Sequence, residues 1–348
     1  MIEMSIVRIF ILTTLSFIVA IAITPVLTHF LFKYKLGKQI RNTGDTPIYS
    51  RLHAGKSGTP TMGGIIIWFT TFIITVLFFY LAKALPSFPL SEFNFLTRSQ
   101  TLLPFGVLIA SALVGLVDDL FNVWRWGHRG NGLRFRFKFL IYTLIAIVGA
   151  WWFYEKLEWD IVHIPFVGNI ELGWWFVPFF IAVIVATAFA VNQTDGLDGL
   201  AGGILLILFA ALGVIAFIEA RYDLTAFTGV IIGSLLAFLW FNIYPARFFM
   251  GDTGSISLGV TLGILAFYLN VVLLLPIIGF VFLWEALSTI IQILSKRLRG
   301  KKVFLSAPWH HHLEAIGWPE PKIVMRLWVI SGVFAVIGLM IFLLDTTY

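Results

Sequence analysis

The chain has 348 residues, of which 59% are hydrophobic and only 12% are charged, and it contains no cysteine. Soluble domains carry about 25% charged residues, so this composition excludes an ordinary soluble protein. The lack of cysteine excludes disulfides and thiolate metal sites. We expect an all-α, polytopic integral membrane protein, because continuously apolar runs indicate helices and not the alternating strands of a β-barrel.

Ten apolar runs are long enough to cross a membrane, which takes about 20 residues per helix. The first run lacks the small-residue cleavage pattern of a signal peptide, so we expect it to be retained as a span. We find no convincing internal repeat and no separate soluble domain, and we expect a single transmembrane domain over residues 1–348. The runs lie at roughly 6–32, 62–82, 100–121, 137–154, 174–191, 200–219, 226–243, 255–270, 272–295 and 323–344.

Basic residues gather beside alternate runs, so the net charge of +6 belongs to one face of the predicted bundle. Lys and Arg near span ends mark the cytoplasmic side, which places the odd-numbered loops in the cytoplasm and both termini outside. One interpretation is that these charges set the topology and attract anionic lipid headgroups. The other is that they also attract an anionic substrate in the cytoplasm. Nucleic acid is not an expected partner. The odd-numbered loops hold 18 of the 24 basic residues: Lys33, Lys35, Lys38, Arg41, Arg51, Lys56, Arg125, Arg129, Arg134, Arg136, Lys138, Arg247, Lys296, Arg297, Arg299, Lys301, Lys302 and Lys322.

The first polar motif is KSGTPTMGG, residues 56–64, directly before the second run. It combines Lys56 with hydroxyls and two glycines, but it is not a Walker A loop, which needs G-x-x-x-x-G-K-[ST]. The motif predicts either a simple turn or a phosphate contact at the start of a helix.

An acidic pair, Asp118 and Asp119, ends the third run in VGLVDDLFN. Carboxylates near the membrane are costly to desolvate unless they are paired, hydrated or bound to a cation. The pair therefore predicts a cation site or a proton acceptor, since two close carboxylates bind Mg²⁺ or raise one pKa. The alternative is a helix that ends in water with two solvated acids.

Two further acids, Asp195 and Asp198, stand in AVNQTDGLDGLAGG between the fifth and sixth runs. Their spacing of three places them on one face if the segment is helical, and the glycines permit close approach of a ligand to the backbone. The alternative is a capping turn that satisfies free N–H groups at the helix start.

A fifth acid, Asp252, lies between glycines in FFMGDTGS, just before the eighth run. There the N–H groups and dipole of a helix N-terminus favour an anion, so Asp252 either caps the helix or coordinates a metal. Phe249 could stack on a base, although one Phe among 35 is also consistent with core packing.

Three consecutive histidines, His310, His311 and His312, follow Pro308 and Trp309 after the ninth run. Adjacent residues cannot all point one way, so at most two converge on a site. Supporting zinc ligands at helical spacing are missing from the sequence. Histidine as a phosphate donor or proton carrier fits this motif better.

Together these motifs resemble the phospho-N-acetylmuramoyl-pentapeptide transferases, which belong to the superfamily of polyprenyl-phosphate N-acetylhexosamine-1-phosphate transferases. The DD, DGLDG and GDTGS blocks resemble the superfamily, whereas SAPWHHH and GWPEPK are similar to its muramoyl-pentapeptide branch. The blocks that carry the resemblance are GTPTMGG, VDDL, VNQTDGLDGLAGG, WFNIYPARFFMGDTGS, SAPWHHHLE and GWPEPKIVMRLW, spread over residues 56–328.

The resemblance implies transfer of phospho-MurNAc-pentapeptide from UDP-MurNAc-pentapeptide to undecaprenyl phosphate, with Mg²⁺, giving lipid I and UMP for peptidoglycan synthesis. It implies an active site on the cytoplasmic face of the bacterial inner membrane, membrane lipids as partners, and a homodimer as one expected assembly. The cytoplasmic loops expected to form this site are at 33–61, 122–136, 192–199, 244–254 and 296–322.

By motif position, Asp252 is the implied Mg²⁺ ligand, with Asp118 and Asp119 as partner ligand or base. The histidine motif is implicated in substrate binding and catalysis. The positions associated with nucleoside or phosphate binding are Lys56, Thr61, Asn192, Asp195, Asp198, Asn242 and Phe249.

One departure from the family concerns charge: Asn122 stands where the family commonly has Lys, and Arg125 or Lys138 could supply the missing cation. The nearest rival is a sister enzyme that transfers GlcNAc-1-phosphate or a related sugar. A more distant rival is a secondary transporter, which would place ionisable residues in mid-span, whereas the clusters here lie at span ends.

Overall fold

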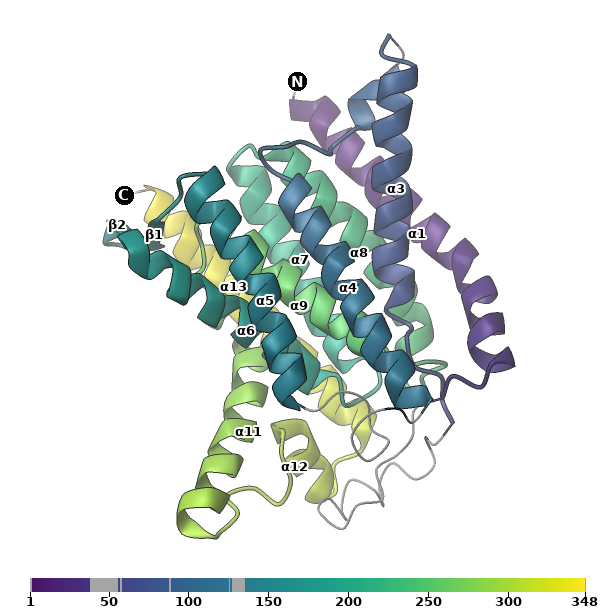
Figure 1. The fold of residues 1–348 in the computed structure, drawn as a ribbon, viewed down its shortest axis with the longest axis vertical. Coiled ribbons are helices and arrows are strands. Elements are labelled where there is room, and N and C mark those ends of the chain that lie inside the picture. Colours follow the sequence, from purple (N-terminus) through teal and green to yellow (C-terminus); the bar gives the residue numbers. More distant parts are fainter. Residues whose placement is uncertain are drawn as a thin grey trace.

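The structure is a computed structural model that describes residues 2–37, 56, 58–87, 89–124, 126 and 135–347 (Figure 1). It confirms the all-α prediction. The expected site loops at 33–61 and 122–136, with Arg125 among them, lie partly outside the described residues.

The helices begin and end close to the apolar runs, because a bilayer offers no water to backbone groups and each segment must satisfy them internally. The α-helices are α1 (Ile2–Lys33), α3 (Ile65–Ala84), α4 (Leu102–Val123), α5 (Phe135–Trp151), α6 (Phe176–Thr194), α7 (Leu200–Ile218), α8 (Tyr222–Asn242), α9 (Asp252–Tyr268), α10 (Leu275–Ile278), α11 (Phe280–Arg299), α12 (Trp309–Ala315) and α13 (Glu320–Thr347). Short helical turns are η2 (Pro89–Phe93), η4 (Trp152–Lys156) and η5 (Gly173–Trp175), and the strands are β1 (Ile161–Ile164) and β2 (Gly168–Glu171).

Among the described residues, eight helices are long and apolar enough to cross a membrane, which makes this a multi-pass membrane protein. They correspond to eight of the ten expected spans. The run at 255–270 forms α9, which has 17 residues and is about 25 Å long at 1.5 Å per residue. The expected continuous helix over 272–295 is wrong, because the chain breaks at Gly279 into the single turn α10 and the helix α11.

Helix α9 is the core of the bundle: every residue from Thr253 to Tyr268 is buried. Its sequence alternates Gly, Ser and Thr with larger apolar residues, and small residues let helices pack closely within a membrane. Helices α4 and α6 pack directly on it, while α1 packs on α8 at the flank of the bundle (Figure 1). Because Asp252 is the first residue of α9, the most buried helix begins at a carboxylate.

The two ends of the bundle differ in content (Figure 1). Both chain termini and the antiparallel β1–β2 hairpin lie at one end, and α12 lies at the other. The hairpin, which the sequence did not predict, contacts the last turns of α13 through a hydrogen bond of 2.5 Å between His163 Nε2 and Asp345 Oδ2. The histidine motif, which lies in α12, is therefore at the end opposite the termini (Figure 1).

The contact between α4 and α9 generates a stability prediction. A Cβ added at Gly115 of α4 would lie 2.4 Å from the backbone oxygen of Asp252, so Gly115→Ala forces the two helices apart. We expect Gly115→Ala to lower the free energy of unfolding by about 1–3 kcal/mol, as overpacking does. Thermal unfolding of the purified protein in detergent measures this change.

Gly106→Ala on the same helix is the matched control, because no atom lies within 4 Å of an added Cβ there. Its melting temperature should equal or exceed that of the wild type, since Ala favours the helical conformation over Gly. Equal melting temperatures for both variants would contradict a tight α4–α9 contact.

Candidate active site

Two carboxylates from different helices share one ammonium group. Asp118, near the end of α4, is 2% exposed, and its Oδ2 lies 2.6 Å from Nζ of Lys138 on α5. The same Nζ donates a hydrogen bond to Oδ2 of Asp252 at the start of α9. Lys138 thus supplies the cation that the sequence lacks at Asn122. Two buried carboxylates this close require such a partner, because desolvation and mutual repulsion both disfavour them.

Asp119 points away from this ammonium and caps α9. Its carboxylate oxygens accept hydrogen bonds from the backbone N–H groups of Asp252, at 3.1 Å, and Thr253, at 3.0 Å. Gly251 has φ of 76°, and a Cβ there would lie 2.5 Å from Asp119 Oδ2, so this close approach requires glycine. The adjacent acids therefore have different partners: Asp118 pairs with a cation, and Asp119 binds a helix N-terminus.

Asn192 brings the end of α6 to the same cluster. Its Nδ2 donates to Asp252 Oδ1 at 2.9 Å and to Ser255 Oγ at 3.0 Å. Asp118, Asp252 and Asn192 thus converge with Lys138, and we call these four residues the acidic centre.

A second cluster surrounds Lys56. Its Nζ lies 2.6 Å from Asp198 Oδ1 and 2.6 Å from Glu320 Oε1, at the start of α13. Burial alone would lower the pKa of Lys56, but the hydrogen bonds and charges of the two carboxylates outweigh it and raise the pKa above its usual value. The side chain therefore stays protonated at neutral pH. The Phe249 ring lies 5.9 Å from Nζ, a cation–π distance.

Asp198 and Asn242 hold the loops that carry this cluster. Asp198 Oδ2 accepts the backbone N–H of Ala246 at 3.0 Å. The Asn242 amide accepts from the N–H of Gly199 at 3.0 Å and donates to the carbonyl of Phe248 at 2.8 Å. Both side chains are 4% exposed. They join the loop after α6 to the loop after α8, and their direct contact with a nucleoside stays a prediction.

The KSGTPTMGG segment lies beside the FFMGD segment. The N–H groups of Gly63 and Gly64 donate to the carbonyls of Phe249 and Met250, each at 2.8 Å. Phe249 in turn donates its N–H to the carbonyl of Pro60 at 2.8 Å. Thr61 is buried in this pairing, at 3% exposure, whereas Asp195 and Phe249 are half-buried.

The rings of His310 and His311 lie together, 4.1 Å apart between centroids, whereas the ring of His312 packs against other residues. His310 is wholly buried, and its Nδ1 lies 3.0 Å from Glu285 Oε2 of α11. His311 Nδ1 lies 2.7 Å from Glu314 Oε2. His312 accepts the N–H of Leu305 at 3.3 Å and packs against Phe304 and Trp309, away from the other two.

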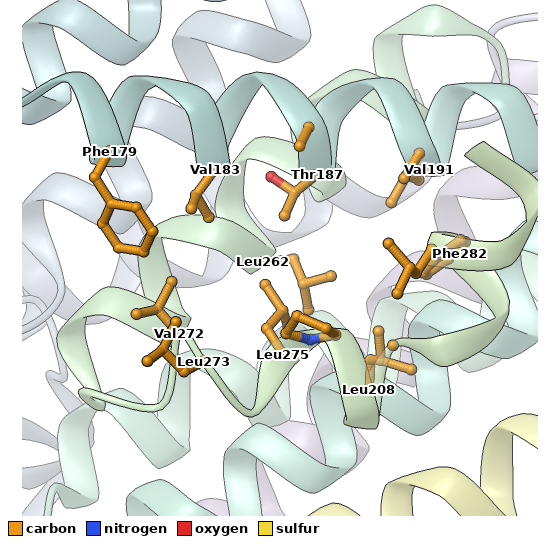
Figure 2. Close-up of a pocket in the computed structure, with 15 residues that line it drawn as sticks. Phe179, Val183, Thr187, Val191, Leu208, Leu262, Val272, Leu273, Leu275 and Phe282 are labelled. Carbon is orange, nitrogen blue, oxygen red and sulfur yellow. The ribbon is translucent and has the colours of Figure 1, made fainter. Parts of the chain in front are cut away.

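An apolar cavity of about 210 Å³ lies between α6, α7, α9 and the α10–α11 break (Figure 2). Phe179, Val183, Thr187 and Val191 of α6 form one wall, and Leu273, Leu275 and Phe282 belong to the opposite side (Figure 2). Val191 directly precedes Asn192 of the acidic centre. The apolar cavity therefore extends along α6 up to the residue before the centre.

Sequence reasoning missed Glu285 and Glu320. Glu285 is a single acid in the apolar stretch VFLWEALSTII, and Glu320 stands in GWPEPK; an acid in an apolar run was the available signal. Among the described residues, no group of three or more His, Cys, Asp or Glu side chains is spaced to hold a metal by itself. Any metal here would need further oxygens from a ligand.

Comparison with known proteins gives two family matches. Residues 101–270 match the family described as glycosyl transferase family 4. Residues 56–67 match signature 1 of phospho-N-acetylmuramoyl-pentapeptide-transferase.

Several curated relatives bear the same name, phospho-N-acetylmuramoyl-pentapeptide-transferase. The relative from Chloroflexus aggregans is 40% identical over 345 residues, which is 95% of this chain and 89% of the relative. The relative from Acetivibrio thermocellus is 38% identical over 93% of this chain and 92% of its own length. The relative from Geobacillus thermodenitrificans is 37% identical over 94% of this chain and 95% of its own length.

The acidic centre generates a prediction for Lys138. In Lys138→Met, Asp118 and Asp252 lose their shared cation, and breaking a buried ion pair from one side costs about 3 kcal/mol. We expect a lower melting temperature that millimolar Mg²⁺ partly restores, because a divalent cation can replace the ammonium between two carboxylates. Thermal unfolding with and without Mg²⁺ measures both effects.

Lys156→Met is the control, because Lys156 is exposed beyond the far end of α5. It should melt like the wild type and show no added response to Mg²⁺. A Lys138→Met protein as stable as the wild type would show that the two carboxylates do not depend on this ammonium.

Proposed function

The chain belongs to the phospho-N-acetylmuramoyl-pentapeptide-transferase family, and from this premise we propose how its own residues carry out the transfer. The reaction moves phospho-MurNAc-pentapeptide from UDP-MurNAc-pentapeptide to undecaprenyl phosphate and yields lipid I and UMP. The observation that carries the proposal is the shared position of Asp118, Asp252 and Lys138 at one end of the bundle. A water-soluble nucleotide and a lipid phosphate can meet only where spans end.

The acidic centre suits Mg²⁺. Asp118 and Asp252 already direct carboxylate oxygens at one cation, the Lys138 ammonium. Mg²⁺ is commonly held by one or two carboxylates together with substrate phosphates, which agrees with the absence of a larger acidic group among the described residues. When bound, the metal would neutralise charge that develops on the diphosphate.

Asp119 has a different role in this proposal from the one its sequence position suggests. Its oxygens accept the backbone N–H groups of Asp252 and Thr253, so it holds the backbone from which the Asp252 side chain projects at the helix start. Asp118 and Asp252 are the proposed metal ligands, and Asp119 holds one of them in place.

We propose direct attack by the lipid phosphate on the sugar-linked phosphorus. The other route would pass through an aspartyl-phosphate on Asp118 or Asp252. Lys138 pairs with both carboxylates, and a carboxylate in an ion pair is a weaker nucleophile. This pairing favours direct attack, in which Lys138 and the two acids bind the phosphate groups and neither acid is the nucleophile.

We propose that the nucleoside binds beside the cluster around Lys56. Phe249 is half-buried and offers a ring on which uracil can stack, and Lys56 lies 5.9 Å from that ring. Asp195 is the more accessible of the two acids in TDGLDG. Asp198 and Asn242 act by holding the loops together.

The apolar cavity is the proposed position for part of the polyprenyl chain. Its lining is almost wholly aliphatic and aromatic (Figure 2), and Val191 of that lining directly precedes Asn192 in the sequence. A lipid chain lying there would bring its phosphate to the acidic centre. The positive-inside bias supports the proposal that this end of the bundle lies at the cytoplasmic face of the bacterial inner membrane.

The two rival functions are less well supported. A sister transferase acting on UDP-GlcNAc would share the acidic centre, but the signature at residues 56–67 and the relatives' names favour the muramoyl branch. A secondary transporter would need ionisable groups along a path through the membrane. The acidic centre instead lies at helix ends, with Asp118 near the end of α4 and Asp252 at the start of α9.

The test is lipid I formation by the purified protein from UDP-MurNAc-pentapeptide and undecaprenyl phosphate. We expect product and UMP in equal amounts, loss of both in excess chelator, and return with Mg²⁺. Asp252→Asn should form no product while it remains folded. UDP-GlcNAc accepted in preference would assign the sister activity, and full turnover in chelator would contradict the metal proposal.

A further inference from the structure

Glu285 is a buried acid that the proposed mechanism does not use. It lies in the second turn of α11 and is 0% exposed. Ser288 and Thr289 donate their hydroxyls to its backbone carbonyl, not to its carboxylate. A carboxylate removed from water needs hydrogen-bond donors or a cation, or it is strongly destabilising.

Among the described residues, the donors to the Glu285 carboxylate all belong to His310. Its two oxygens accept the backbone N–H of His310 at 3.2 and 3.3 Å, and Oε2 lies 3.0 Å from His310 Nδ1. Within the described part of the chain, Glu285 forms no ion pair with Lys or Arg. With Glu285 ionised, Nδ1 carries the proton of this contact, because a carboxylate oxygen only accepts.

A proton fixed on Nδ1 leaves Nε2 as the ring atom available for a ligand. Nε2 is buried and has no hydrogen-bond partner within the described chain. It faces the loop between α6 and α7: a Cβ added at Gly196 would lie 2.3 Å from it. Gly196 follows Asp195 in the loop that the proposed function assigns to the nucleotide, so the unpartnered nitrogen is aimed at that loop.

We infer that Glu285 is a positioning residue for the transfer, acting through His310. It holds the Nδ1 proton and the orientation of the ring, so that the imidazolium form of His310 donates its Nε2–H to a diphosphate oxygen when the donor enters beside the 192–199 loop. This inference rests on the proposed function. It explains why the apolar first half of α11, outside the acidic centre, carries an acid, and why the loop has glycine at 196.

The kinetic test compares Glu285→Gln, His310→Ala and the double variant in the lipid I assay. Glu285→Gln keeps the size of the side chain but replaces a carboxylate, which only accepts hydrogen bonds, by an amide that can also donate them. We expect kcat to fall at least about tenfold, as on loss of other groups that orient an imidazole, with KM for undecaprenyl phosphate unchanged. The double variant should be no slower than His310→Ala, because Glu285 acts only through His310.

Ser288→Ala is the control for packing. Ser288 is also buried on α11, and its hydroxyl bonds the Glu285 carbonyl without touching His310. It should keep wild-type kcat. Glu285→Asp keeps the charge on a shorter side chain and should be more active than Glu285→Gln. If Glu285→Gln does not fold, the same comparisons are made with Glu285→Asp.

A spectroscopic readout separates positioning from stability. The chain has seven histidines, and ¹⁵N-histidine NMR, with His310 assigned by its loss in His310→Ala, reports which ring nitrogen is protonated. We expect a proton on Nδ1 in the wild type and loss of that preference in Glu285→Gln.

Three results would overturn the inference. The first is a wild-type kcat in Glu285→Gln, and the second is a double variant whose loss of kcat is the product of the losses in the two single variants. The third is an unprotonated Nδ1 of His310 in the wild type. If the wild type makes no lipid I, the proposed function fails. The NMR measurement would then still decide whether Glu285 fixes the His310 proton.

Discussion

The Lys138 ammonium between Asp118 and Asp252 is the interaction on which the site depends. Three carboxylates meet where α4 ends and α9 begins, in a protein that is otherwise largely apolar. Two of them need a cation, and Asp119 needs the N–H groups at the start of α9. Without these partners, repulsion and desolvation would separate the helices.

The rest of the bundle follows from bringing these groups together. Gly115 allows α4 to approach the first residue of α9, and Gly251 allows the backbone to pass Asp119. The small residues of α9 let α4 and α6 pack on it along its length. The Lys56 cluster joins three chain segments through Asp198 and Glu320, and Glu285 with His310 joins α11 to the loop after α6. Each polar contact ties together segments that are distant in sequence.

The sequence predicted the parts of this structure that are local. The length of the apolar runs identified the eight spanning helices. In a membrane each segment must hydrogen-bond its own backbone N–H and C=O groups, so its helical structure depends on that segment alone. The acid motifs were recognised because charges beside apolar runs are rare. Lys138 was named as one of two possible cations, and it pairs with Asp118 and Asp252. The other candidate, Arg125, lies outside the described residues.

The parts that were missed depend on contacts across the fold. Asp118 and Asp119 are adjacent and chemically identical, and only the position of α9 decides which one caps a helix and which one faces Lys138. The break at Gly279 comes three residues after Pro276, and this Pro and Gly were the available signal inside a run that its length favoured as one helix. Glu285 was overlooked because its partner is 25 residues away in the chain.

The measurement that tests the central claim most directly is the sidedness of the two ends of the bundle. The chain has no cysteine, so Lys301→Cys, on the loop after α11, and Glu171→Cys, at the end of the hairpin, each give one exposed thiol. In spheroplasts, an impermeant thiol reagent should label position 171 at once and position 301 only after the membrane is opened. Labelling of 301 but not 171 from outside would put the acidic centre on the face without cytoplasmic nucleotide and would contradict the account.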